Sequence, residues 1–400
     1  MIRLGVIGMG ARAIGMTRLL LQADAEVRLA AVADPAEGDI RARLMAAGIN
    51  AGGTTFFTDV DALLHRAAAD LDGLLIGTRC HLHTPIAVRC APAGLPIFLE
   101  KPVAISVEQV AALAGAFAGR DGNVVVSFPL RTSPLYDEAL RIVASGRLGV
   151  VNQVQAWNYV PYGGIYFGQW YRDFDVTGGL WLQKATHDLD AVRALVGADP
   201  VRVAAVGSRR IYGGDRPPDL TCDACDRAET CPEGPTAIAA RGDDGGMGRG
   251  NHACAFSSSI RHHDAGSAVV MHANGVIAGY AQNLVSRRNA GARGARVTGY
   301  LGTLEFNWYS EQLTVIDHHG REVESRKVTV TTGHHGGDHV LARNFIDVIR
   351  GVAAPRCTLR DGLVSAAVCA AAQRSEERGT FERVDLPRFP GACVHGSAVG

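Results

Sequence analysis

The sequence predicts a two-domain α/β protein, in which a doubly wound parallel sheet is followed by an α+β domain with an open, mostly antiparallel sheet. Up to about residue 125, short apolar runs alternate with segments of helical periodicity. After Phe128, strand-like segments dominate instead. The alternation is typical of βα units, and the later run of strands is typical of an antiparallel sheet.

The composition is that of a globular protein with no excess of positive or negative charge. Its 400 residues are 47% hydrophobic and 20% charged, enough for two cores. Forty basic and 40 acidic residues give zero net charge, so neither nucleic acid nor an anionic membrane is an expected partner. The apolar runs have strand length, and the first residues lack the features of a signal peptide. We therefore expect a cytoplasmic protein with no membrane span.

Six buried strands are expected in the first domain, residues 1–128. They are Ile2–Ile7, Val27–Ala33, Thr55–Phe57, Gly73–Gly77, Pro96–Glu100 and Val124–Phe128. Helical stretches separate most of them, which predicts parallel pairing.

The second domain, residues 129–337, is expected to hold the substrate site and an oligomer surface. Strand-like segments lie at Val150–Tyr159, Val201–Ile211, Ser267–Gln282, Ala295–Gly299, Thr303–Asn307 and Leu313–Asp317, with helices at Leu135–Ser145 and Gly179–Leu195. A Gly-, Asp-, Pro- and Cys-rich stretch, 213–254, is predicted to be an insertion. Two final helices, at about 338–350 and 360–378, belong to a segment 338–387 expected to pack back on the first domain, before a mobile tail at 388–400.

The turn Gly8-Met9-Gly10 connects the first predicted strand to the first predicted helix. This is the setting of the Rossmann dinucleotide fingerprint, in which glycines let backbone amides approach a pyrophosphate at the helix N-terminus. Ala13 stands at the third glycine position, an accepted variant. The sequence therefore predicts a nicotinamide dinucleotide site.

Asp34 ends the second predicted strand, where an acidic side chain accepts hydrogen bonds from the adenosine ribose. Its alternative role is to cap a helix in front of Pro35. An acidic residue followed by Pro35 and Ala36, with no arginine beside it, favours NAD over NADP. We also expect cofactor contacts from a set of residues near the strand ends: Gly8, Gly10, Ala11, Arg12, Thr78, His83, Glu100 and Lys101.

Three further motifs give the chain a family resemblance. Glu100-Lys101-Pro102 follows the fifth strand, Gly178-Gly179 precedes His187, and His83 lies in Cys80-His81-Leu82-His83-Thr84-Pro85. With these motifs the chain resembles the family of glucose–fructose oxidoreductases, inositol dehydrogenases and MocA-type proteins, from the first strand to about residue 385. The resemblance implies an oxidoreductase that moves hydride between NAD(P) and a sugar, polyol or glycoside, and a homodimer or homotetramer that pairs its open sheets.

The resemblance also implies catalytic roles. Lys101 would lie at the nicotinamide and polarise the substrate oxygen, and Pro102 is expected to fix the turn as a cis peptide. His187 would accept the hydroxyl proton, since imidazole titrates near neutral pH. Helical spacing predicts that Lys184 lies beside His187, where it could lower the pKa of the histidine or bind substrate.

One position departs from the family pattern. Typical members carry an aspartate four residues before the histidine, and this chain has Gln183 there. An amide orients a sugar hydroxyl but cannot orient an imidazolium as a carboxylate does. Two alternatives therefore stay open: a redox-neutral NAD-dependent glycosidase or lyase that oxidises its substrate transiently, and a non-catalytic NAD-binding sensor.

Further substrate contacts are expected from Tyr159, Arg172, Gln183 and His335. Tyr159 belongs to an aromatic concentration at 157–181 that could stack on sugar faces or form core. Arg172 could bind a carboxylate or hydroxyl, or pair with Asp173 or Asp175. His335 lies in a Gly-rich loop before a helix, where Asp338 is a candidate N-cap.

The insertion carries a possible metal motif. Cys222 and Cys225 are separated by two residues, Cys231 follows, and Cys254 or His252 could be a fourth ligand. This spacing predicts a structural zinc site, with an iron–sulfur cluster, free thiols or one disulfide as alternatives. The scattered Cys80, Cys90, Cys357, Cys369 and Cys393 are expected to be core residues or free thiols.

Overall fold

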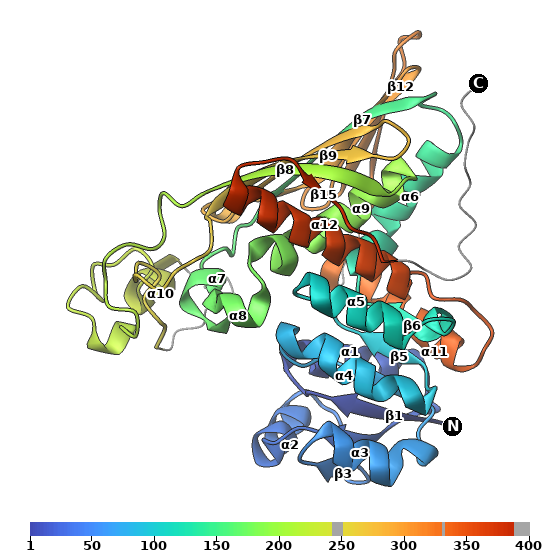
Figure 1. Cartoon of the computed structure of the whole chain (residues 1–400), viewed down its shortest axis with the longest axis vertical. Helices are drawn as coiled ribbons and strands as arrows, with labels where there is room; N and C mark the ends of the chain where they lie inside the picture. The colour runs from blue at the N-terminus through green and yellow to red at the C-terminus, as the bar shows by residue number, and fades with distance from the viewer. Residues whose placement is uncertain (242–250, 330–332, 388–400) are drawn as a thin grey trace. The chain divides into compact units, whose positions relative to one another are not determined.

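The computed structural model describes residues 1–241, 251–329 and 333–387 (Figure 1). The predicted tail 388–400, with Cys393, lies outside this range. The chain divides into two compact units: the first contains Met1–Ser127 and His339–Val364, and the second contains Phe128–Asp338 and Ser365–Asp385. Within the described ranges, no helix is long and apolar enough to cross a membrane.

The first unit is built on a six-stranded, entirely parallel sheet with the order β3-β2-β1-β4-β5-β6. This is the strand order of a doubly wound dinucleotide-binding sheet, and it confirms the predicted fold. The strands are β1 Ile2–Ile7, β2 Val27–Ala33, β3 Thr55–Phe57, β4 Gly73–Ile76, β5 Ile97–Leu99 and β6 Val124–Val126, and the helices are α1 Ala11–Ala23, α2 Glu37–Ala46, α3 Val60–Ala67, α4 Cys80–Cys90, α5 Val107–Ala116 and α11 Gly337–Ile349.

Local sequence explains where these helices begin. Asp59 caps α3 by accepting the backbone N–H of Ala62 at 2.9 Å, and Ser106 caps α5 by accepting that of Gln109 at 3.2 Å. Such caps satisfy N–H groups that have no partner inside the helix. Every residue of β4 is buried, as expected of a central parallel strand covered on both faces.

The second unit is built on a nine-stranded sheet with the order β14-β13-β12-β11-β7-β10-β9-β8-β15, in which only β7 and β10 pair in parallel. The mostly antiparallel sheet is therefore confirmed. Its strands are β7 Val151–Tyr159, β8 Pro200–Ser208, β9 Ala265–His272, β10 Ile277–Asn283, β11 Ala292–Gly299, β12 Gly302–Asn307, β13 Gln312–Asp317, β14 Val323–Lys327 and β15 Glu382–Arg383, and its helices are α6 Pro134–Ala144, α7 Ile165–Gly168, α8 Phe174–Thr177, α9 Thr186–Val196, α10 Pro235–Arg241 and the second half of α12 Leu359–Arg378. Helices α6 and α9 lie against one face of the sheet (Figure 1).

Three of the differences from expectation have a clear local reason. The segment 267–282 is a hairpin of β9 and β10, because Gly275, at φ +85°, turns the chain between them. Strand β14 was missed because its sequence, Val-Glu-Ser-Arg-Lys, is mostly exposed and charged, and a charged edge strand carries little apolar pattern. The helix expected at Gly179–Leu195 begins with a π-helical turn, Trp181–Ala185, and continues as α9.

Among the glycines of the first unit, Gly8 leaves the least room for a side chain. Its φ is +76°, and a Cβ there would lie 2.3 Å from Thr78 Cγ2 and 2.7 Å from Thr78 Cα. We expect Gly8→Ala to lower the free energy of unfolding by about 1–3 kcal/mol in urea denaturation, because it adds strain and a backbone clash. Gly15→Ala is the matched control, since a Cβ at Gly15 of α1 meets no atom within 4 Å and alanine favours the helix. A loss at Gly15 equal to that at Gly8 would contradict this explanation.

Candidate active site

The turn between β1 and α1 is shaped for close approach by a ligand. Gly8 lies against Thr78, and Gly10 precedes the first residue of α1, Ala11. In the described residues no side chain caps α1, and its first turn carries no acidic residue. Its leading N–H groups and positive dipole end therefore face outward from a glycine turn, which fits the pyrophosphate of a dinucleotide.

Asp34 links this turn to the end of β2. Its Oδ2 accepts the backbone N–H of Met9, and its Oδ1 accepts that of Ala36, each at 3.0 Å. Helix α2 begins at Glu37 with Ala36 at its N-cap, so Asp34 does not cap the helix as the alternative reading supposed. The carboxylate is half-buried at the carboxyl end of its strand.

Arg12 and Glu100, both expected to touch the cofactor, bind each other. Arg12 Nε donates to Glu100 Oε1 at 2.9 Å, and Arg12 Nη2 donates to Ser127 Oγ at 3.0 Å. Glu100 is 5% exposed. The pair ties the start of α1 to the end of β5, and it thereby fixes the residue that follows Glu100, which is Lys101.

The Lys101–Pro102 turn is braced from α4, and its peptide bond is cis, as expected. The ring of His83 lies with Nδ1 2.8 Å from the Pro102 carbonyl oxygen and Nε2 3.1 Å from that of Thr78. Thr84 Oγ1 donates to the Val103 carbonyl at 2.7 Å. Burial lowers the pKa of His83, which favours the neutral ring. His83 therefore positions the lysine turn, because its ring nitrogens face the carbonyl oxygens of Pro102 and Thr78. Its contact with the cofactor stays a prediction.

In the second unit, Gln183, Lys184 and His187 are all buried, at 4%, 4% and 8% exposure. The π-helical turn carries the first two, and such turns recur at functional sites. Lys184 Nζ donates to Tyr162 Oη at 2.7 Å and lies 4.5 Å from the centre of that ring. His187 packs edge-on against Phe128, with ring centres 5.9 Å apart.

A buried ion pair that the sequence analysis missed lies beside these residues. Arg293 Nε donates to Asp188 Oδ1 at 2.7 Å, while Asn158 Nδ2 and Tyr280 Oη each donate to Oδ2 at 2.9 Å. Both charged residues are 4% exposed. An arginine at an inward-facing position of β11 was the one sequence signal for this pair. Its partner, Asp188, could not be inferred, because it lies on a helix 105 residues away in the sequence.

Electrostatics sets the charge of these buried groups. Burial lowers the pKa of Lys184, Arg293 lowers it further, and Tyr162 and Asp188 act in the opposite sense. Although burial opposes its charge, Asp188 raises the pKa of Arg293 above its ordinary value, so Arg293 stays charged.

Two residues predicted to contact the substrate lie in other surroundings than this cluster. Tyr159 is 39% exposed, and it follows Asn158, whose side chain reaches Asp188. Because successive side chains of a strand point to opposite faces, Tyr159 points away from this cluster. Arg172 donates from Nη2 to Ser257 Oγ and, at 2.7 Å, to Ser259 Oγ, so it holds the segment after the insertion.

His335, the remaining predicted contact, lies near the cluster. Its ring centre is 6.0 Å from that of Tyr309, and its backbone is held at φ +53°. Burial and the charge of Arg293 lower its pKa, which favours the neutral ring. Asp338 binds the neighbouring His334, with His334 Nδ1 and Asp338 Oδ2 2.7 Å apart.

The zinc site expected in the insertion is not supported. Within the ranges that the structure describes, no group of three or more His, Cys, Asp or Glu side chains is arranged to hold a metal ion. Cys222, Cys225, Cys231 and Cys254 are free and partly exposed, and burial raises the pKa of Cys222 and Cys231, which favours their thiol form. The scattered Cys80, Cys90, Cys357 and Cys369 are buried, as expected of core residues.

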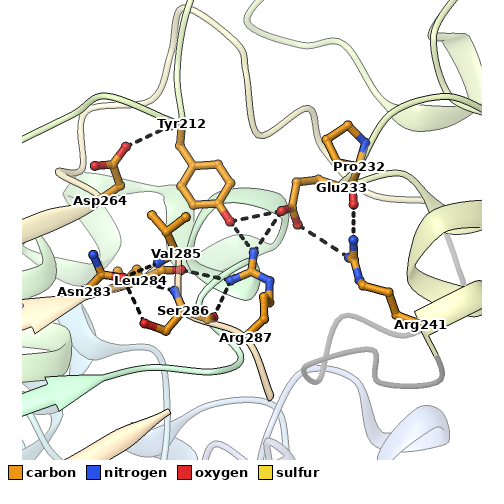
Figure 2. Close-up of polar contacts among 10 residues, drawn as sticks. All are labelled: Tyr212, Pro232, Glu233, Arg241, Asp264, Asn283, Leu284, Val285, Ser286 and Arg287. Atoms are coloured by element: carbon orange, nitrogen blue, oxygen red, sulfur yellow. Dashed lines mark hydrogen bonds and ion pairs between the residues drawn. The ribbon is translucent and has the colours of Figure 1, made fainter. Parts of the chain in front are cut away.

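Hydrogen bonds and ion pairs hold the insertion to the sheet domain (Figure 2). Arg287, after β10, places Nη2 2.9 Å from Glu233 Oε1, and Tyr212 Oη donates to the same oxygen at 3.2 Å. Arg241 Nη2 lies 3.9 Å from Glu233 Oε2. Just before the insertion, Asp264 Oδ2 accepts the backbone N–H of Tyr212 at 3.0 Å. Glu233, largely buried, is thus the centre of this anchor.

The two halves of the chain match the two domains of an oxidoreductase family. Residues 2–128 match the family's NAD-binding Rossmann fold, and residues 141–386 match its C-terminal α/β domain. The chain therefore belongs to the Gfo/Idh/MocA oxidoreductase family, as the motifs predicted.

Similar proteins include sugar and polyol enzymes. An inositol 2-dehydrogenase of Rhizobium meliloti (strain 1021) is 29% identical over 210 residues, 52% of this chain and 58% of that protein. The rhizopine catabolism protein MocA of Rhizobium meliloti is 28% identical over 233 residues, 56% of this chain and 68% of that protein. The matches span between 34% and 68% of the curated relatives' length.

Solved structures agree with this fold over nearly the whole chain. A levoglucosan dehydrogenase in complex with NADH and levoglucosan has a TM-score of 0.75 at 17% identity, covering 96% of this chain and 99% of that one. An oxidoreductase domain protein from Kribbella flavida gives the same TM-score of 0.75 at 18% identity, again covering 96% and 99%. At these identities the likeness establishes the fold.

Glu233→Gln tests the anchor of the insertion. We expect faster maleimide labelling of Cys222, Cys225 and Cys231, followed by mass spectrometry, because a neutral amide pairs more weakly with two arginines. Glu305→Gln is the control, since Glu305 pairs with Arg296 at an exposed site. Labelling that a zinc chelator accelerates, and that Glu233→Gln leaves unchanged, would instead show that metal holds the insertion.

Proposed function

We propose that the protein is an NAD-dependent oxidoreductase that transfers hydride between a carbon of a sugar, polyol or glycoside and the nicotinamide. The observation that carries this proposal is the Lys101–Pro102 turn at the carboxyl end of β5, braced by His83 and Thr84. Ligands of doubly wound sheets bind outside the carboxyl ends of the strands. Relatives named as inositol dehydrogenases and a structural neighbour named levoglucosan dehydrogenase support the substrate class.

The catalytic roles follow from the chemistry of three side chains. NAD, when bound, supplies the hydride acceptor. Lys101 places a cation on the substrate oxygen and stabilises its alkoxide character as hydride departs. His187 accepts the hydroxyl proton, and Gln183 hydrogen-bonds a neighbouring hydroxyl.

Asp34 supports NAD over NADP. Its carboxylate lies at the end of β2, where the adenosine ribose binds in doubly wound folds. A carboxylate accepts hydrogen bonds from ribose hydroxyls but repels a 2′-phosphate. The two hydrogen bonds that it accepts from backbone N–H groups hold it in place for this role.

Removal of the Lys101 ammonium tests the catalytic proposal. With a panel of sugars and polyols, we expect NADH formation by the wild type and a loss of about 10²–10³-fold in kcat/KM for Lys101→Ala. NADH affinity, followed by fluorescence, should stay within a few-fold. Lys327→Ala, which removes an exposed lysine of β14, is the matched control.

Other outcomes would select the rival functions. Glycoside cleavage with solvent deuterium in the product and no net NADH would support the redox-neutral glycosidase or lyase. Tight NADH binding without turnover on any member of the panel would support the sensor.

We also propose that the protein self-associates through the outward face of β8, β9 and β10. Val206, Val269, Met271 and Ile277 are exposed there at 67%, 43%, 39% and 43%, and Ile277 pairs with Met271.

We expect Met271→Glu to lower the mass measured by light scattering to that of a single chain, because a charge on this apolar face opposes its burial. Val352→Glu, which changes an exposed valine of the first unit, should leave the mass unchanged. A single-chain mass for the wild type would overturn the proposal.

A further inference from the structure

The buried cluster around Lys184 holds more positive than negative charge. Lys184 and Arg293 are each 4% exposed. The carboxylate beside them is that of Asp188, and both its oxygens already accept hydrogen bonds, from Arg293, Asn158 and Tyr280. Asp188 therefore balances one of the two cations and has little capacity left for the other.

The donors of both cations are incompletely used. Arg293 Nη2 is sealed from solvent and has no hydrogen-bond acceptor among the residues that the structure describes. Lys184 carries three donor hydrogens, and its hydrogen bond within the described chain is to Tyr162 Oη. A buried guanidinium nitrogen without an acceptor costs free energy, which an oxygen ligand would recover.

In the part of the chain that the structure describes, the aromatic groups around Lys184 and Asp188 add no second negative charge. Tyr162 and Tyr166 face Lys184 from the segment after β7, and Tyr280 faces Asp188 from β10. Tyr309 follows β12, where the Trp308 backbone N–H donates to the Arg293 carbonyl at 2.8 Å. Burial raises the pKa values of Tyr166, Tyr280 and Tyr309. These phenols stay protonated near neutral pH, and His335, with its lowered pKa, stays neutral.

A carboxylate on the ligand fits this environment. It would accept from Lys184 Nζ and Arg293 Nη2 together, and charge-assisted hydrogen bonds of this kind are among the strongest in proteins. We propose that Lys184 and Arg293 form a carboxylate subsite and that the substrate is accordingly a sugar acid, such as a uronate or an aldonate. This inference rests on the proposed function for the reaction, but the subsite itself is a matter of binding.

Proton uptake should accompany this binding. A carboxylate beside Lys184 favours the charged amine, so its pKa rises when the acid binds. Because burial and Arg293 lower the pKa of Lys184 in the free protein, binding above that lowered pKa takes up a proton. The affinity for a sugar acid should therefore fall as the pH rises through this range, and the affinity for a neutral sugar should not.

Calorimetric titration of the NADH-loaded full chain tests the subsite. The probes are D-glucuronate and D-gluconate, with D-glucose and D-glucitol as neutral counterparts and D-glucose 6-phosphate as an alternative anion. We expect the acids to bind at least about tenfold more tightly than their neutral counterparts, with heats in buffers of different ionisation enthalpy that report proton uptake.

Variants locate the effect. Lys184→Gln should weaken acid binding about tenfold or more and change neutral-sugar binding little, because a glutamine can still bind Tyr162 but carries no charge. Arg293→Lys keeps a cation for Asp188, removes the Nη2 donor and should weaken acid binding as well. Arg296→Gln, on the same strand, removes an exposed arginine that pairs with Glu305 and should leave acid binding unchanged. NADH affinity and melting temperature serve as checks of folding.

The outcomes separate the subsite from the reaction. Absence of acid binding, equal affinity for acids and neutral sugars, or an equal loss for both in Lys184→Gln would overturn the subsite. Preference for D-glucose 6-phosphate would overturn its assignment to a carboxylate. Acid binding that needs Lys184, without NADH formation or consumption, would uphold the subsite and overturn the proposed hydride transfer.

Discussion

The organisation of the second unit depends on one buried carboxylate. Asp188 projects from α9 and binds donors on β11, β7 and β10, which lie side by side in the sheet. A buried ion pair recovers its desolvation cost only when its remaining hydrogen-bonding capacity is also satisfied. Asp188 meets that condition with three donors, whereas Arg293 Nη2 has no acceptor among the described residues. The contact fixes α9 on the sheet, and with it the position of His187, one residue earlier.

In the first unit, side chains that bind main-chain groups act together with the Arg12–Glu100 ion pair. His83, Thr84 and Asp34 all bind main-chain groups of turns that end parallel strands. Side chains that hold turns in this way fix the backbone itself, so they support both a close pyrophosphate contact at Gly8 and a defined Lys101. Main-chain hydrogen bonds and one ion pair thus position the candidate groups of the first unit, and a buried ion pair with its hydrogen bonds positions those of the second.

The sequence was sufficient for most of the sheet architecture and for the dinucleotide turn. The strands of the first unit are continuous apolar runs, so their pattern survives without knowledge of the partners. The pairs Asp188–Arg293, Lys184–Tyr162 and Arg12–Glu100 could not be predicted, because each joins residues at least 22 positions apart through the fold. The π-helical turn was also hidden, since one wider turn inside a helical pattern leaves no periodic signal, and the cysteine spacing of the insertion permits chelation without requiring it.

Gln183 affects the charge of this turn as well as its acid–base chemistry. Where the motif resemblance leads us to expect an aspartate, this chain has a neutral amide, and the next residue is Lys184. The amide makes the turn less negative than that expectation. Asp188 cannot compensate, because its oxygens are committed to Arg293 and to the sheet. A substrate that carries a carboxylate would balance the positive charge of Lys184. The proposed acidic substrate would thus supply the negative charge that an aspartate at position 183 would have provided.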